Sequence, residues 1–393
     1  LPSQFAFFIG GLMFGTLYAR QIFTVPGLGP NIYNIGIILG AFIGPIFLTG
    51  FFGIIGMSWG ALFGALVGNL LIPYWAMKKI GLKFKPSLDY KHPGVVKVFK
   101  LMLPVVLGLS LPGVYALIMQ AFGSYYPAGV NTYLEFSNKL MQAPLGVFGQ
   151  SLAIGVFPAL AQFYAQQRMD MFRNQLSSTL RTVIYLTLPC SILMAIMAPQ
   201  IVAALLQHGN FTAENTMPTA AALRWFSIGI TAWCMHPVLM RGFFAAHITV
   251  KPIVLGTLTT ALFLAMVSVL WNQVPALGFL SLPLSSSISA IFLVIVLVIA
   301  VAKTIGGIDF KGIGDTLVKS LLSSVALALV VSPMLIPSVT EWTLRSKLGA
   351  LGSFAFLSLV GAWAYYFASR ALGMPESGTI SRALDRVTNR KRA

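Results

Sequence analysis

Long apolar segments recur along the whole sequence, and short stretches containing polar residues separate them. Apolar runs of about 18 or more residues are typical of membrane-spanning helices, because about 20 helical residues cross the hydrocarbon core of a bilayer. The pattern predicts eleven spans, at about residues 5–19, 31–49, 53–77, 101–121, 132–163, 182–206, 218–244, 252–271, 277–302, 317–337 and 348–370. The sequence therefore predicts an all-α, polytopic membrane protein.

Prolines modify two of these segments. The segment 132–163 is too long for one simple span, and Pro144 and Pro158 are expected to kink it or end it early, because proline removes a helical hydrogen bond. Asn31 follows Pro30 and is expected to mark the start of its helix.

Composition and charge agree with a membrane protein. Hydrophobic residues make up 57% of the 393 residues and charged residues only 9%, whereas soluble domains carry about 25% charged residues. The net charge of +17 comes mostly from lysines and arginines between the spans, and most of them fall in one set of alternating loops. Such loops are cytoplasmic under the positive-inside rule. The charge therefore predicts a cytoplasmic C-terminus and no nucleic-acid partner.

The sequence contains few residues in patterns that are typical of catalysis. It contains no phosphate-binding Walker loop, no HExxH motif and no recognisable Ser/His/Asp set or paired-carboxylate site. Cys190 and Cys234 fall in apolar stretches and are expected to be packing residues rather than a disulfide or metal site. We expect a protein that is not an enzyme and that has no cofactor or metal.

An internal repeat suggests how the spans are grouped. "YARQIFTVP" (18–26) resembles "FAAHITVKP" (244–252), and the same offset of 226 carries the span 53–77 close to the span 277–302. Residues 5–77 then correspond to the second half of a unit whose full copy is about 101–302. About 125 residues and three spans are expected upstream, which is consistent with an outside location for Leu1. Tandem repeats of this kind are common in transporters.

Four segments carry a family resemblance: "VPGLGPNIYNIGII" (25–38), "NKLMQAPLGVFGQSLAIGVFPALAQ" (138–162), "LLQHGNFT" (205–212) and "LMRGFFAAHITVKP" (239–252). On these motifs the chain resembles the MurJ/MviN family, flippases of the peptidoglycan precursor lipid II within the wider multidrug and polysaccharide exporter family. The resemblance implies fourteen helices, with two six-helix lobes around a central cavity and a final pair that lines a groove for the lipid tail. On that map the chain holds the fourth helix onward.

The implied function is movement of a lipid-linked disaccharide-pentapeptide from the inner to the outer leaflet of the bacterial cytoplasmic membrane by alternating access. The implied partners are that precursor, membrane lipids and cell-wall synthesis enzymes. Two alternatives stay open: an exporter of another lipid-linked sugar or of drugs, and a non-transporting membrane scaffold.

The expected organisation has five parts. They are an N-terminal lobe remnant (1–77), a basic cytoplasmic linker (78–100), a C-terminal six-helix lobe (101–302), a terminal helix pair (303–370) and a basic cytoplasmic tail (371–393). The linker is either an amphipathic connector on the anionic inner leaflet or a solvated loop. The terminal pair is either the lipid-tail groove that the resemblance implies or two accessory helices.

The candidate substrate site is a polar stripe inside the span 132–163, formed by Glu135, Asn138, Lys139 and Gln142. An ionisable residue at mid-membrane costs roughly 2.5–3.5 kcal/mol, so such residues usually face a cavity. Glu135 and Lys139 have the i, i+4 spacing that allows an ion pair. The stripe either lines the cavity or snorkels to the outer interface. In MurJ proteins the position of Lys139 is often Arg, and that of Gln142 often acidic.

Further candidates lie near the ends of other spans. Asn34 is either a substrate contact or an interhelical hydrogen-bonding residue. Arg20, Arg241 and His247 belong either to a cytoplasmic gate or to ordinary positive-inside anchoring.

Overall fold

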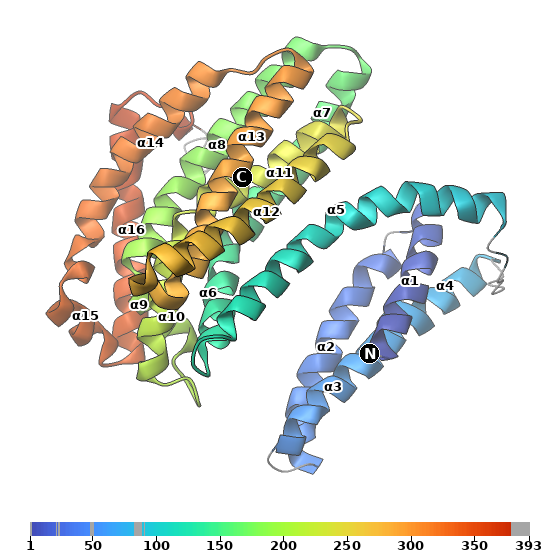
Figure 1. Cartoon of the computed structure of the whole chain (residues 1–393), viewed down its shortest axis with the longest axis horizontal. Coiled ribbons are helices and arrows are strands. Elements are labelled where there is room, and N and C mark those ends of the chain that lie inside the picture. Colours follow the sequence, from blue (N-terminus) through green and yellow to red (C-terminus); the bar gives the residue numbers. More distant parts are fainter. Residues whose placement is uncertain are drawn as a thin grey trace, which may run out of the picture. The chain divides into compact units, whose positions relative to one another are not determined.

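The computed structural model describes residues 2–20, 22, 24–47, 51–81, 89 and 91–378, and all regular elements in these ranges are helices (Figure 1). Within them, eight helical segments are long and apolar enough to cross a membrane: Thr24–Ile46, Ile55–Lys79, Val130–Ala165, Met169–Ile196, Val250–Gln273, Pro275–Ile305, Phe310–Leu335 and Lys347–Ala371. The all-α, polytopic prediction is confirmed.

The three other expected spans are also helical. The segment 5–19 lies in α1 (Pro2–Ala19), which carries Ser3 and Gln4 in its first turn. The segment 101–121 lies in α5 (Pro93–Gly123), where a shorter apolar helix is found at Val114–Gly123. The segment 218–244 is divided between two helices.

The chain forms two compact units, Leu1–Val96 and Lys97–Ala393. The first contains α1, α2 (Thr24–Phe47), α3 (Phe51–Ala65), the π-helical turn η1 (Leu66–Leu71) and α4 (Ile72–Lys79). Helices α2 and α3 pack through glycines: an added Cβ at Gly40 would lie 2.2 Å from the Gly56 carbonyl oxygen, and one at Gly60 would lie 2.1 Å from that of Gly36. Small residues allow such close approach between membrane helices.

The second unit holds the remaining elements: the rest of α5, α6 (Val130–Pro144), η2 (Leu145–Gln150), α7 (Ser151–Ala165), α8 (Met169–Ile196), α9 (Ala198–Leu206), α10 (Ala213–Ser227), α11 (Ile230–Ala245), α12 (Val250–Gln273), η3 (Pro275–Leu280), α13 (Ser281–Ile305), α14 (Phe310–Val331), η4 (Ser332–Leu335), α15 (Pro337–Leu344) and α16 (Lys347–Ala371). Its core includes Phe172 and Tyr185 of α8, Phe226 of α10 and Phe243 of α11. Helix α14 packs against both α8 and α16 (Figure 1).

Two helices begin earlier than the sequence predicted. Helix α2 starts at Thr24 and passes through Pro30, and the Asn31 side chain donates a hydrogen bond to the Gly27 carbonyl oxygen (3.0 Å), so Asn31 does not start the helix. Helix α8 starts at Met169 rather than near residue 182. Sequence reading missed these turns because the glycines and prolines at the start of α2, and the charged residues at the start of α8, resemble a loop.

The prolines of the segment 132–163 do not end its helix. Helical structure continues from Val130 to Ala165, and the turn that follows Pro144 is the π-helix η2. Single π-helical turns inside α-helices are frequently found at functional sites.

The helix bounds follow the offset of the internal repeat. Adding 226 to the bounds of α2 gives 250 and 273, which are the bounds of α12. The same shift takes the end of α1 to the end of α11 at Ala245, and the end of α4 to the end of α13 at Ile305. Helices α2 and α12 therefore have the same length, and the ends of the two other helical segments keep the same offset.

Parts of the basic linker and tail lie outside the described residues. This concerns residues 82–88 and 90 of the linker 78–100, and residues 379–393 of the tail.

Candidate functional site

The polar stripe lies on the face of α6 that points away from the core of its own unit. Val130, Leu134, Ser137 and Met141 form the buried face at helical spacing. Glu135 and Lys139 lie elsewhere on the helix, and their side chains are 67% and 65% exposed. A charged pair on an outward face of a membrane helix must meet either water or lipid, and lipid is the costlier environment.

Local contacts join the stripe residues in pairs. The Nζ atom of Lys139 lies 2.7 Å from Oε1 of Glu135. The side-chain amide of Gln142 donates a hydrogen bond to Oδ1 of Asn138. The spacing of four residues brings each pair together on adjacent turns, as the sequence predicted for Glu135 and Lys139. The structure thus places four expected residues on one accessible helix surface.

Two features position α6. The Tyr133 hydroxyl donates a hydrogen bond to Oδ1 of Asn215 at the start of α10 (2.9 Å), which fixes the first turns of α6. At its other end α6 passes into the π-helical turn η2, which begins one residue after Pro144. The stripe therefore lies between a hydrogen-bonded anchor and a local change of helical pitch.

Two of the expected gate residues, Arg241 and His247, contact α7. The Arg241 guanidinium lies 5.5 Å from the centre of the Phe157 ring, and the His247 ring lies 5.6 Å from that of Tyr164. His247 adopts a left-handed backbone conformation (φ 57°) just after α11 ends. The end of α11 and the loop after it are thus fastened to α7 by aromatic contacts.

Arg20 and Asn34 belong to the first unit. Arg20 is exposed in the turn after α1, where its backbone N–H donates to the Leu17 carbonyl oxygen (3.0 Å). Asn34 is exposed on α2. Both residues thus belong to a different compact unit from the stripe, which lies on α6 of the second unit.

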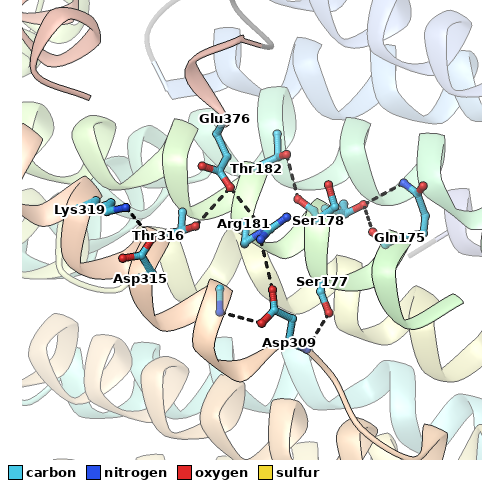
Figure 2. Close-up of polar contacts among 12 residues, drawn as sticks. Gln175, Ser177, Ser178, Arg181, Thr182, Asp309, Asp315, Thr316, Lys319 and Glu376 are labelled. Atoms are coloured by element: carbon cyan, nitrogen blue, oxygen red, sulfur yellow. Dashed lines mark hydrogen bonds and ion pairs between the residues drawn. The ribbon is translucent and has the colours of Figure 1, made fainter. Parts of the chain in front are cut away.

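A second polar site, which the sequence did not predict, surrounds Arg181 of α8 (Figure 2). The Arg181 Nη1 atom lies 3.2 Å from Oδ2 of Asp309, just before α14, and its Nε atom lies 3.4 Å from Oε1 of Glu376, which follows α16. Thr316 of α14 donates a hydrogen bond to the same Glu376 oxygen (3.2 Å). Arg181, Asp309, Thr316 and Glu376 are called the Arg181 cluster below.

Asp309 uses both of its carboxylate oxygens. Its Oδ1 accepts the backbone N–H of Gly312 (2.8 Å), which caps the start of α14, while Oδ2 pairs with Arg181. Its own backbone N–H donates to the Ser177 hydroxyl (3.1 Å; Figure 2). The beginning of α14 is therefore tied to α8 by both a charged contact and a backbone contact.

In the described part of the chain, no group of three or more His, Cys, Asp or Glu side chains is arranged to hold a metal ion. Cys190 and Cys234 are free thiols there.

Comparison of the sequence with known proteins identifies the family of the chain. The sequence model of the family described as "Lipid II flippase MurJ" matches residues 1–351. The chain belongs to the MurJ family. A probable lipid II flippase MurJ of Haemophilus influenzae is 27% identical over 292 residues, which are 71% of this chain and 56% of that protein. The Vibrio cholerae protein of the same description is 28% identical over 60% of this chain and 44% of its own length.

A solved MurJ structure supports the fold. "Lipid II flippase MurJ, inward closed conformation" superposes with a TM-score of 0.74 at 21% identity, and the alignment covers 94% of this chain and 71% of that one. The chain thus has the MurJ fold and is a multi-pass membrane protein. It spans about half the length of the curated MurJ relatives that it matches.

The Arg181 cluster escaped sequence analysis for a physical reason. Its charges come from segments far apart in the chain, and no local spacing connects Arg181 with Asp309 or Glu376. Arg181 directly precedes the expected span at 182–206, where the positive-inside rule already explains a positive charge without a partner. The MurJ family match ends at residue 351, so it does not include Glu376.

Proposed function

We propose that the protein is a lipid II flippase, which moves the lipid-linked peptidoglycan precursor from the inner to the outer leaflet by alternating access for cell-wall synthesis. The chain's place in the MurJ family supports this function. The observation that carries it furthest is the exposed Lys139–Glu135 pair, because it puts a cation on an outward face of a membrane helix.

In this proposal Lys139 attracts the diphosphate of the precursor as its headgroup passes. Lysine acts there as a point charge, without the planar fork with which arginine binds phosphate. Glu135 neutralises Lys139 in the resting state and releases it when the anion arrives. Asn138 and Gln142, which already bond to each other, offer hydrogen bonds to the sugar or peptide, and Asn34 supplies a further polar contact.

The proposal assigns each part of the chain a place in an alternating cycle. Residues 1–77 belong to the N-terminal lobe, 101–302 form the C-terminal lobe, and 78–100 connect the two on the cytoplasmic side. The segments 303–370 and 371–393 are the terminal helix pair and a basic tail, so the C-terminus lies in the cytoplasm and the protein in the bacterial inner membrane. The family membership and the lysine-rich linker support this arrangement.

Arg20, Arg241 and His247 form the cytoplasmic gate in this proposal. The contacts of Arg241 and His247 with α7 support it, because α7 continues the same helical segment as the stripe. Movement of the stripe helix would thereby reach the loop after α11.

Complementation tests the proposed function. The complete gene product is expressed in cells depleted of their own MurJ, and growth and cell shape are followed. Rescue is expected. If the protein inserts into the membrane at normal levels and the cells still lyse, the lipid II assignment is wrong. Transport of another lipid-linked sugar or a scaffolding role would then have to be examined.

A further inference from the structure

The terminal helices contact α8 and α9 at three levels, which follow one another along these two helices. At the first level, Arg181 meets Asp309 and Glu376. At the second, the Tyr185 hydroxyl lies 3.0 Å from that of Ser369, and Tyr365 donates a hydrogen bond to the Tyr185 carbonyl oxygen (2.8 Å). These contacts connect α8 with the beginning of α14, the end of α16 and the segment after it.

The third level lies in α9. The side-chain amide of the fully buried Gln200 donates to the Thr343 hydroxyl of α15 (3.4 Å) and lies 3.3 Å from the Met334 sulfur. Gln200 follows Arg181 by 19 residues and lies beyond the end of α8 at Ile196, in the next helix. The polar contacts therefore join the terminal helices to both α8 and α9.

The first level differs from the others because one guanidinium holds two carboxylates from two elements. Arg181 is 27% exposed, Asp309 is 44% exposed and Glu376 is only 6% exposed. Oε2 of Glu376 is buried and accepts no hydrogen bond from the described residues, so Arg181 and Thr316 hold this carboxylate through Oε1 alone. A buried carboxylate that loses its cation is strongly disfavoured.

We propose that Arg181 is a positioning residue that fastens both ends of the terminal helix pair to α8, so that α14, α16 and α8–α9 behave as one body. Loss of the guanidinium releases Asp309 and Glu376 together. Loss of one carboxylate releases only the segment that carries it. The role of this body in transport rests on the proposed function, but its assembly does not.

Hydrogen exchange on the purified full chain tests the proposal without any transport measurement. In Arg181→Gln, we expect amide protection to fall about tenfold or more in two segments, 309–313 and 374–378. Protection near Ser369 and near Gln200 should stay within twofold of wild type, which would establish that the variant is folded. Unchanged protection in both segments would overturn the proposal.

Single-carboxylate variants separate positioning from general stability. Glu376→Gln should expose 374–378 while leaving 309–313 protected, and Asp309→Asn should do the reverse. Lys319→Gln is the matched control, because Lys319 pairs with Asp315 within α14 alone (2.9 Å), and it should change neither segment. If each carboxylate variant loosened both segments to the same extent, Arg181 would not be the common anchor and the proposal would be wrong.

Discussion

At the scale of single residues, Gly312 shows how tightly the Arg181 cluster is built. A Cβ added there would lie 2.0 Å from Oδ2 of Asp309 and 2.7 Å from Nη1 of Arg181. Gly312→Ala should therefore push the two charged groups apart and destabilise the fold by about 1–3 kcal/mol, the usual cost of overpacking. The measurement is the apparent unfolding temperature in detergent.

Gly314 provides the matched control for that experiment. It lies in the same helix, but no atom lies within 4 Å of a Cβ added there. Gly314→Ala should leave the unfolding temperature unchanged or raise it slightly, since alanine favours helix over glycine by about 1 kcal/mol. If the unfolding temperature fell equally in the two variants, the Arg181 cluster would tolerate a side chain at position 312.

Glu135 should matter less than Lys139. Glu135→Gln removes the ion-pair partner of the lysine but keeps the cation that, in the proposed function, attracts the headgroup. We expect lipid II transport to fall no more than about tenfold, a difference of about 1.4 kcal/mol. A loss as large as that of Lys139→Ala would mean that the carboxylate itself contacts the substrate or a coupling ion.

The sequence predicts the local ion pair of the stripe but not the Arg181 cluster. The ion pair of Glu135 and Lys139 follows from a spacing of four residues on one helix, so the sequence alone predicts it. Glu376 and Arg181 meet only because α16 and α14 pack beside α8. Such tertiary pairs have no signature in the order of residues of a single chain.

At the scale of elements, the α2–α3 hairpin depends on its glycines. Gly60→Ala would place a methyl carbon 2.1 Å from the Gly36 carbonyl oxygen, so the helices must separate. We expect a lower unfolding temperature and reduced amounts of protein in the membrane. Gly15→Ala in α1 is the control, because nothing lies within 4 Å of its added Cβ. Similar behaviour of both variants would argue against close packing of the hairpin.

Membrane topology can be tested at exposed positions of three elements. Cysteines replacing Ser124 and Ser338 should react with an impermeant thiol reagent added from outside, whereas one replacing Asn174 should react only after the cells are opened. All three positions are exposed, so burial would not mask the reaction. Labelling of Asn174→Cys in intact cells would reverse the proposed orientation.

Hydropathy located the helices better than their limits. Each expected span contains helix, because in lipid the backbone must satisfy its own hydrogen bonds. The first turns of α8 were missed since Arg173 and Arg181 resemble loop charges in the sequence. The break at Met197 between α8 and α9, and the division of α10 from α11, lie within apolar sequence where periodicity gives no boundary.

At the scale of the whole molecule, the internal repeat can be compared directly with the observed ends of the helices. An offset found in nine residues also relates the limits of α2 and α12. The proposed function is less accessible to such reasoning, because helix bounds carry no information about the molecule that a protein binds. Chemistry at the stripe is therefore the more direct test of function.

The decisive measurement is lipid II exposure at the outer leaflet of cells that depend on this protein, comparing wild type with Lys139→Ala, Lys139→Arg and Lys303→Ala. Loss of a charge contact in a low-dielectric site is worth about 2–3 kcal/mol, or about 30- to 150-fold. Lys303 is an exposed lysine in the last turn of α13 and serves as the charge-matched control. The account predicts that exposure collapses in Lys139→Ala at normal membrane levels, while Lys139→Arg and Lys303→Ala retain it. Wild-type exposure in correctly inserted Lys139→Ala would contradict the account.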